Sequence, residues 1–221
     1  MAMFAHELSV AHYRSFDRYR LTLSGGVTVL AGPNAVGKTN LIEALQLLTS
    51  GTSFRHPTAA ELVRDGVGSC KVELRLEGDG RVLDMGLCVE DGKRSFSRNG
   101  KRCAAAGVRG VLPSVLFCPD HLDMVKRGAS VRRAALDDFG VQLSARYADL
   151  SSTYGRCVTQ RNALLKESWC CREMLGAWNE SLARAGSALL VHRLALVDRL
   201  AGHVRDAYGQ VASGEPADVS Y

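Results

Sequence analysis

The sequence predicts an α/β fold made of two lobes, the first built on a mixed sheet over residues 1–120 and the second on helices over residues 121–215. Three observations support this prediction. Short alternating segments separated by glycine-rich turns fill the first part of the chain. Within that part, a glycine-rich loop joins an apolar run to a helix. After about residue 120, the apolar period changes from two to three and four.

Short strands are expected in the first lobe because apolar and polar residues alternate between turn signals. The expected strands are 19–23, 27–30, 72–76 and 82–89. The turn signals are Ser24-Gly25-Gly26, Gly78-Asp79-Gly80, Glu90-Asp91-Gly92 and Asn99-Gly100. The run 27–30 is almost entirely apolar, so we interpret it as a buried strand. The later segments predict antiparallel hairpins beside the glycine-rich loop.

The second lobe is predicted to contain an antiparallel helical hairpin. Apolar residues repeat at steps of three and four along two seams, from Tyr147 to Leu164 and from Leu175 to Leu196. Residues 166–172 join the seams, and the adjacent Cys170 and Cys171 near this turn are taken as incidental. Aromatic residues on the seams are expected in the core rather than on a base-stacking platform. Residues 213–216 break the second helix, and 216–221 are expected to begin another strand.

Composition excludes several classes of protein. A chain of 221 residues that is 46% hydrophobic can bury a sizeable core, and its net charge of +5 tolerates a polyanionic partner without requiring one. The seven cysteines form no Cys-x-x-Cys pair and the six histidines have no metal-ligand spacing, which argues against a zinc site or a disulfide framework. No stretch approaches the roughly 20 apolar residues of a membrane span, and the N-terminus lacks a secretory signal. We therefore expect a cytoplasmic protein with no membrane partner.

The strongest functional signal is Gly32-Pro33-Asn34-Ala35-Val36-Gly37-Lys38-Thr39, which matches the phosphate-binding pattern G-x-x-x-x-G-K-[ST]. Gly32 and Gly37 let the backbone turn out of a strand and approach phosphates closely. The helix that follows presents its N-terminal N–H groups to the anion. Lys38 is expected to reach the β- and γ-phosphates and the Thr39 hydroxyl to take one Mg²⁺ position, with Asn40 adjoining them. The pattern predicts ATP and Mg²⁺ as cofactors, but kinases, switches and motors all share it.

Further stretches occur in the order of the motifs of one known family. They are His12-Tyr13-Arg14-Ser15-Phe16, Thr49-Ser50-Gly51-Thr52-Ser53-Phe54-Arg55, Val115 to Leu122, Gly128-x-Ser130-x-Arg132-Arg133-x-x-Leu136-Asp137, and Gln160 to Lys166. Through these stretches, which cover essentially the whole chain, the sequence resembles the RecF family, which is related to the SMC-type ABC ATPases. The resemblance implies an ABC-ATPase-like nucleotide-binding lobe.

The resemblance also implies roles for single residues. Arg14 corresponds to an arginine that lies close to the nucleotide. Ala35 stands where the family usually has glycine, which is compatible with nucleotide binding if its φ is negative. Asp120 lies where ABC ATPases carry a loop that senses the γ-phosphate. It is a candidate for contacting the metal ion or the water molecule that attacks the phosphate. Pro-Asp is also a common turn pair, which needs no such role.

Two ABC-ATPase features are absent from the sequence. Leu23-Ser24-Gly25-Gly26 resembles the ABC signature, but it precedes the phosphate-binding loop instead of following the helical lobe. Ala134 to Asp138 is too short and polar to be the apolar strand ending in Asp-Glu that holds Mg²⁺. We therefore expect a chain that lacks the catalytic half, binds ATP weakly and hydrolyses it negligibly.

The resemblance implies an ATP-dependent DNA-binding protein of DNA replication, recombinational repair and the SOS response to DNA damage. The complete protein would be a slow DNA-dependent ATPase that dimerises with ATP between its subunits and acts on single-strand/double-strand DNA junctions with a RecR-type mediator. Residues that could face DNA phosphates are Arg55, Lys126, Arg127, Arg132 and Arg133. An alternative is a DNA- or partner-binding module in which ATP is only a conformational ligand. A small P-loop kinase is a third hypothesis, which the long helical seams disfavour.

Overall fold

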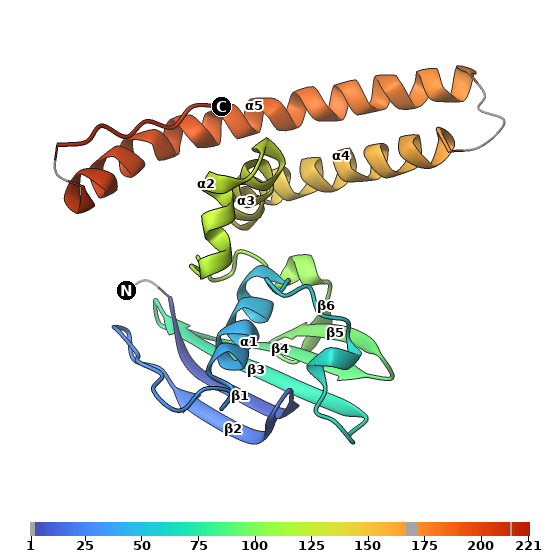
Figure 1. Cartoon of the computed structure of the whole chain (residues 1–221). Helices are drawn as coiled ribbons and strands as arrows, with labels where there is room; N and C mark the ends of the chain where they lie inside the picture. The colour runs from blue at the N-terminus through green and yellow to red at the C-terminus, as the bar shows by residue number, and fades with distance from the viewer. Residues whose placement is uncertain (1–2, 167–171, 213) are drawn as a thin grey trace. The chain divides into compact units, whose positions relative to one another are not determined.

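The structure is a computed structural model that describes residues 3–166, 172–212 and 214–221 (Figure 1). The chain divides into two compact units, Met1–Leu116 and Phe117–Tyr221. The first unit is α/β and the second is helical, as the sequence predicts. Cys170 and Cys171 lie outside the described residues.

The first unit contains one six-stranded sheet with the order β2-β1-β3-β4-β5-β6. Its strands are β1 (Phe4–Tyr13), β2 (Phe16–Thr22), β3 (Ser69–Gly78), β4 (Arg81–Glu90), β5 (Lys93–Arg98) and β6 (Lys101–Cys103). Every neighbouring pair is antiparallel, so the sheet of the described residues is not mixed. Strand β1 is not among the strands expected from the sequence.

Two-residue turns join the last four strands. Both residues of Asp79-Gly80, Asp91-Gly92 and Asn99-Gly100 have positive φ, between 49° and 73°. Asp and Asn tolerate this left-handed conformation and glycine adopts it without steric cost, which is why these pairs close hairpins. The hairpins predicted from the turn signals are therefore confirmed.

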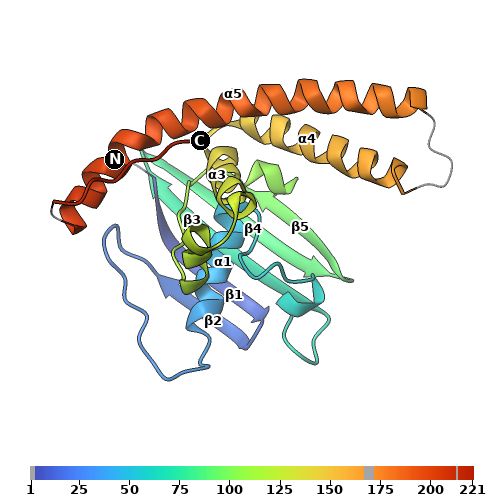
Figure 2. The same cartoon turned by 45° about the horizontal axis from the view of Figure 1, so that its top comes forward.

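The core of the first unit lies between the sheet and α1 (Lys38–Ser50), which crosses one face of the sheet (Figure 2). In β3, alternate residues from Cys70 to Leu76 are buried under the helix while their neighbours are exposed. Leu41, Ala44, Leu47 and Leu48 form the buried face of α1. The short helices η1 (Ala60–Leu62) and η2 (Ala105–Gly107) complete the unit.

The prediction of a buried strand at residues 27–30 is wrong for this structure. The segment is irregular, and the side chains of Val27 and Val29 are 90% and 78% exposed. A strand must pair its N–H and C=O groups with a neighbour, and this segment pairs with none of the described strands of the sheet. Apolar composition alone therefore did not make it a strand.

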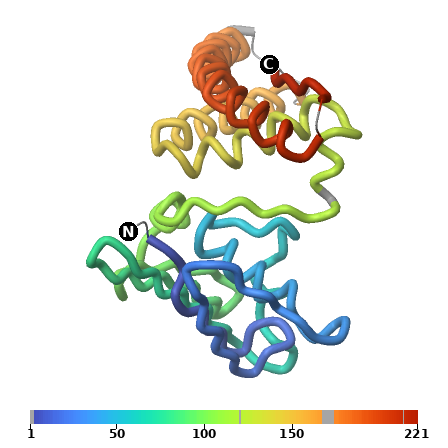
Figure 3. The backbone as a smooth tube through the Cα atoms, turned by 90° about the vertical axis from the view of Figure 1, so that its left-hand side faces the viewer, coloured from blue at the N-terminus to red at the C-terminus, as the bar shows by residue number. Residues whose placement is uncertain are grey.

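The second unit is built from helices. They are η3 (Pro119–Leu122), α2 (Asp123–Lys126), α3 (Ala129–Leu143), α4 (Ala145–Leu164) and α5 (Arg172–Val211). Figures 1 and 3 show α4 and α5 side by side in opposite directions, as the two seams predict. Tyr147, Leu189 and Leu196 form the centre of their shared core. Residues 134–138 belong to α3, in agreement with the expectation that they are not a strand.

The end of the chain differs from the expectation. Residues 216–221 form no strand and instead lie along α5 (Figure 1). Arg205 contacts Asp218 at 3.4 Å, and Arg193 donates a hydrogen bond to the hydroxyl of Tyr221 at 3.3 Å. Among the described residues no second strand lies beside the segment, so its backbone has no ladder to join.

Candidate nucleotide-binding site

The glycine-rich loop ends where α1 begins, and its backbone follows an unusual path. Gly32 and Gly37 have φ values of 155° and 104°, and Gly37 is the N-cap residue of α1. No side chain caps the helix, and its first turn contains no acidic residue. The first N–H groups of a helix have no intrahelical acceptor, so this end of α1 offers donors and a positive dipole end to an anion.

Lys38 lies over the loop that precedes it. Its Nζ donates hydrogen bonds to the carbonyl oxygens of Gly32 and Pro33, both at 2.7 Å. The ammonium group is therefore held above the backbone of the loop, where phosphate oxygens would meet it. Thr39 is exposed in the first turn of α1, so its hydroxyl is accessible to a metal ion. These groups fit a triphosphate with one Mg²⁺.

Ala35 does not have the negative φ under which the sequence predicted that it would be compatible with nucleotide binding. Its φ is +65°, in the left-handed region, rather than negative. A side chain in this region crowds its own backbone, which costs about 1–2 kcal/mol relative to glycine. The loop therefore reaches its curved form with strain at this residue.

The turn between β1 and β2 packs directly on the loop. A Cβ atom at Gly37 would lie 2.6 Å from the ring of Phe16 and 2.8 Å from the hydroxyl of Ser15, so only glycine fits there. The amide of Asn40 donates to the Ser15 hydroxyl at 3.2 Å. The turn thus supports the loop and the first turn of α1 from one side.

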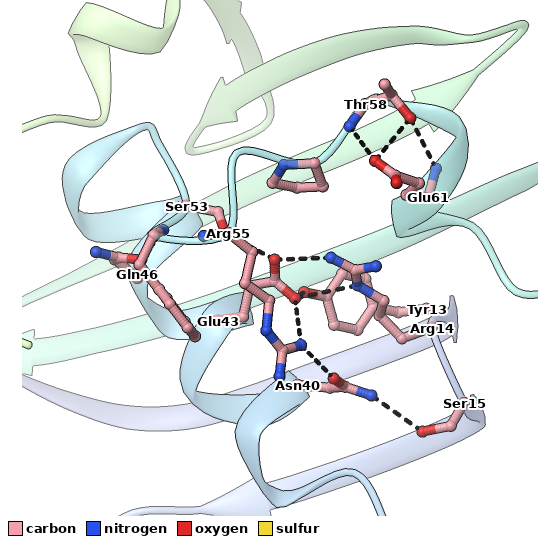
Figure 4. A network of polar contacts seen from close by, with 12 residues as sticks. Tyr13, Arg14, Ser15, Asn40, Glu43, Gln46, Ser53, Arg55, Thr58 and Glu61 are labelled. Carbon is pink, nitrogen blue, oxygen red and sulfur yellow. Dashed lines mark hydrogen bonds and ion pairs between the residues drawn. The ribbon is translucent and has the colours of Figure 1, made fainter. Parts of the chain in front are cut away.

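Arg14, which the resemblance places near the nucleotide, forms a two-pronged ion pair with Glu43 of α1 (Figure 4). Its Nε and Nη2 donate to the two carboxylate oxygens at 3.0 and 2.8 Å. Ser53 and Tyr13 also donate to this carboxylate, at 2.7 and 3.2 Å. The structure therefore places Arg14 close to the helix that follows the loop, but in contact with an acidic residue that the sequence analysis did not select.

Glu43 could have been noticed in the sequence as a lone acid within the apolar stretch Leu41 to Leu48. An acid on the buried face of a helix requires a partner. Its partners come from segments that lie 10 to 30 positions away along the chain, such as Ser53 and Tyr13. The sequence alone could not identify them.

The candidate DNA-facing residues fall in two places. Arg55 belongs to the first unit, where its Nη1 donates to Asn40 Oδ1 at 2.9 Å. The four others lie on α2, on α3 or between them in the second unit, and all are exposed. Arg127 pairs with Asp123 at 2.7 Å, and Arg132 donates to the carbonyl of Arg127 at 2.9 Å. Lys126, Arg127, Arg132 and Arg133 thus lie together in the second unit, whereas Arg55 belongs to the first unit.

Asp120 lies in η3, but its side chain is outside the described part of the structure. The described helices include none whose length and apolar character would suffice to cross a membrane.

Comparisons with known proteins identify clear relatives. A family model described as an AAA domain matches residues 7–102. The DNA replication and repair protein RecF of Arthrobacter sp. (strain FB24) is 36% identical over 99% of this chain and 57% of its own length. RecF of Streptomyces avermitilis is 35% identical over 96% of this chain and 60% of its own length. The chain therefore spans less than two thirds of the length of these relatives.

Solved structures agree with the sequence matches. The structure of "the recombination mediator protein RecF-ATPrS in RecFOR pathway" has a TM-score of 0.89 and 26% identity. A second structure, of RecF-ATP in the same pathway, has a TM-score of 0.88 and the same identity. Each match covers 97% of this chain and 59% of the solved chain. The likeness therefore includes both units.

Proposed function

The chain belongs to the RecF family, and from this premise we propose that it binds ATP and Mg²⁺ at residues 32–39 and serves DNA replication and recombinational repair. The observation that carries the proposal is the position of Lys38, whose Nζ lies 2.7 Å from two carbonyl oxygens of the loop. Directly beside it, α1 begins without a side-chain cap and without an acidic residue in its first turn. This arrangement suits a polyphosphate.

Each group in the loop has a definite role in this proposal. The N–H groups at the start of α1 would donate to phosphate oxygens, and Lys38 would neutralise charge on the β- and γ-phosphates. The Thr39 hydroxyl would be a ligand for Mg²⁺, which would supply positive charge beside the phosphates. Gly37 keeps the backbone free of a Cβ where the ring of Phe16 supports it.

DNA is the proposed macromolecular partner, with contacts at the α2–α3 region. Lys126, Arg127, Arg132 and Arg133 are exposed there, on α2, on α3 or between them. Exposed cations that follow one another along the chain can meet successive phosphates, and they contribute affinity without reading sequence.

The wider function is proposed from the family. We expect a slow DNA-dependent ATPase in the complete protein, an ATP-dependent homodimer, a RecR-type mediator as partner, and DNA junctions as the preferred substrate. ATP hydrolysis would then release DNA and the mediator. The protein would act in the cytoplasm, where bacterial DNA lies.

Titration calorimetry with MgATP tests nucleotide binding. The unmodified chain should bind, and Lys38→Ala should weaken binding by about 10- to 100-fold, as expected for loss of hydrogen bonds to charged groups. Lys101→Ala, which removes an exposed lysine of β6, is the matched control and should bind as the unmodified chain does. Equal affinity of the Lys38 and Lys101 variants would contradict the proposed site.

A titration of labelled DNA with and without ATP at two salt concentrations tests the second half of the proposal. ATP should strengthen DNA binding, and replacing Arg132 and Arg133 together by alanine should weaken binding and flatten its salt dependence. Binding that is equally strong without ATP and falls steeply with salt would favour a DNA-binding module. No change in the double variant would remove the α2–α3 region as the DNA surface.

A further inference from the structure

Helix α1 contains a buried carboxylate, that of Glu43, which lies outside the phosphate-binding loop. The side chain of Glu43 is 0% exposed. Glu43 follows Thr39 by four positions, so both lie on the same side of the helix, one turn apart. A buried carboxylate is tolerated only when donors surround it, and the identity of those donors indicates what the residue does.

Five hydrogen bonds satisfy Glu43 (Figure 4). Arg14 supplies two of them, at 3.0 and 2.8 Å, and Ser53 and Tyr13 supply one each, at 2.7 and 3.2 Å. Arg55 adds a longer contact from Nη1 at 3.5 Å. Burial raises the pKa of Glu43, but the hydrogen bonds from Arg14 and Ser53 outweigh it and hold the pKa below its ordinary value. Glu43 is therefore an ion with donors on both oxygens.

Arg14 and Arg55 differ in how they relate to Glu43. Two nitrogens of Arg14 bind the carboxylate, the side chain is only 19% exposed, and the backbone N–H donates to Leu62 at 3.0 Å. Arg14 thus neutralises Glu43 and is held in place by it. Arg55 is 38% exposed, contacts the same carboxylate through a single nitrogen at 3.5 Å, and donates from that nitrogen to Asn40 at the shorter distance of 2.9 Å.

The charges of the cluster do not cancel. One carboxylate faces two guanidinium groups, so the group formed by Glu43, Arg14 and Arg55 has a net charge of +1. The excess lies on Arg55, because Arg14 makes the closer, two-pronged pair. Arg55 Nη1 also donates to Asn40 Oδ1 at 2.9 Å. Asn40 follows Thr39 in the first turn of α1, so the excess positive charge lies beside the end of the helix that attracts anions.

The conformation of Arg55 is held from several sides. Its guanidinium lies 5.3 Å from the centre of the Phe54 ring, and its backbone N–H donates to the Ser53 hydroxyl at 3.1 Å. Ser53 in turn donates to Glu43 at 2.7 Å. Glu43 therefore binds both the side chain of Arg55 and the hydroxyl that anchors its backbone.

We propose that Glu43 is a positioning residue of the nucleotide site, and that it holds Arg55 against the first turn of α1 as a second cation for the phosphates, in addition to Lys38. This inference rests on the proposed function, because it requires that residues 32–39 bind ATP. It assigns Arg55 to the nucleotide, rather than to the DNA surface predicted from the sequence. Arg14 is the counter-ion that keeps Glu43 charged and in place.

Calorimetric titration of the full chain with MgATP and MgADP tests the proposal. Arg55→Ala should weaken nucleotide binding by about tenfold, the effect of one hydrogen-bonded charge. Arg55→Lys should restore part of the affinity, since it keeps the charge. Arg75→Ala is the matched control, because Arg75 is also partly exposed and forms an ion pair, with Asp84 at 2.9 Å on the sheet.

A double-mutant cycle separates positioning from simple support of the fold. If Glu43 acts through Arg55, Glu43→Gln should weaken nucleotide binding in the unmodified chain but add little in an Arg55→Ala background. If Glu43 only stabilises the unit, its substitution should lower the melting temperature and weaken binding equally in both backgrounds. That result would overturn the proposal.

If Glu43→Gln does not fold, the nucleotide affinities of the single variants at Arg55, Arg75 and Lys38 still test the proposal. The proposal is overturned, and the ATP site stands, if Arg55→Ala binds MgATP as tightly as the Arg75→Ala control while Lys38→Ala binds more weakly than both. If the unmodified chain shows no binding of either nucleotide, the proposed function itself fails. Weaker DNA binding by Arg55→Ala with unchanged nucleotide affinity would return Arg55 to the DNA surface.

Discussion

Replacing Ala35 by glycine should stabilise the first unit. Ala35 has a φ of +65°, which costs a residue with a Cβ about 1–2 kcal/mol. Glycine removes this cost but adds about 0.4–1 kcal/mol of backbone entropy to the unfolded chain. The difference favours Ala35→Gly by roughly 0.5–1 kcal/mol, which corresponds to a rise in melting temperature of about 2–5 °C for a unit of this size.

Thermal and urea unfolding, followed by circular dichroism, measure the effect. Ala31→Gly is the matched control because Ala31 is also exposed, lies just before the loop, and is not among the residues with positive φ. The control should lose about 0.4–1 kcal/mol, so the two substitutions should change stability in opposite directions. If both lower the stability by the same amount, Ala35 is not strained and our account of the loop is wrong.

Three further predictions concern packing and titration. Gly140→Ala should destabilise the second unit by about 1–3 kcal/mol, because its Cβ would lie 2.6 Å from the Tyr147 ring. Gly155→Ala, in α4 with no atom within 4 Å of the new Cβ, should instead stabilise it by about 0.5–1 kcal/mol; urea unfolding compares the two, and equal signs would contradict the packing argument. Burial raises the pKa of the Cys70 thiol from 9.0 to about 11, so the unfolded chain loses this proton first and stability should fall as pH rises from about 9 to 11. Cys70→Ala should reduce this loss of stability at alkaline pH. If the urea midpoint depends on pH in the same way in the variant and in the unmodified chain, the Cys70 thiol is not buried. The lowered pKa of Glu43 acts in the opposite sense. The ionised carboxylate stabilises the fold above pH 4.5, the ordinary pKa of the group, and this stabilisation is lost as the pH falls below that value. Glu43→Gln should make the urea midpoint less dependent on pH in that acidic range, and an identical acid profile in both proteins would show that Glu43 is not ionised in the fold.

Much of the fold followed from local sequence patterns. The pairs Asp79-Gly80, Asp91-Gly92 and Asn99-Gly100 predicted three turns, because few other residues adopt two successive left-handed conformations. The two apolar seams predicted α4 and α5, because a helix brings positions three and four apart to one face. These signals depend only on neighbours in the chain, so they could be interpreted without knowledge of the tertiary structure.

The run 27–30 shows where local patterns failed. Its apolar residues suit a buried strand, but a strand also needs a partner, and the sequence of the run contains no information about what lies beside it. Ala35 is similar, since the residue type does not determine the sign of φ. In the structure the loop imposes φ of +65° on it.

The sequence by itself was enough to propose the phosphate-binding loop, because a backbone cradle needs Gly32, Gly37, Lys38 and Thr39 at set intervals along one short segment. Only the tertiary structure decided the surroundings of Glu43. Arg14 and Ser53 lie 29 and 10 positions from it, and they meet its carboxylate because the β1–β2 turn and the segment after α1 pack against the same helix. Burial of a charge requires several donors at once, and donors from distant segments are brought together only by the folded chain.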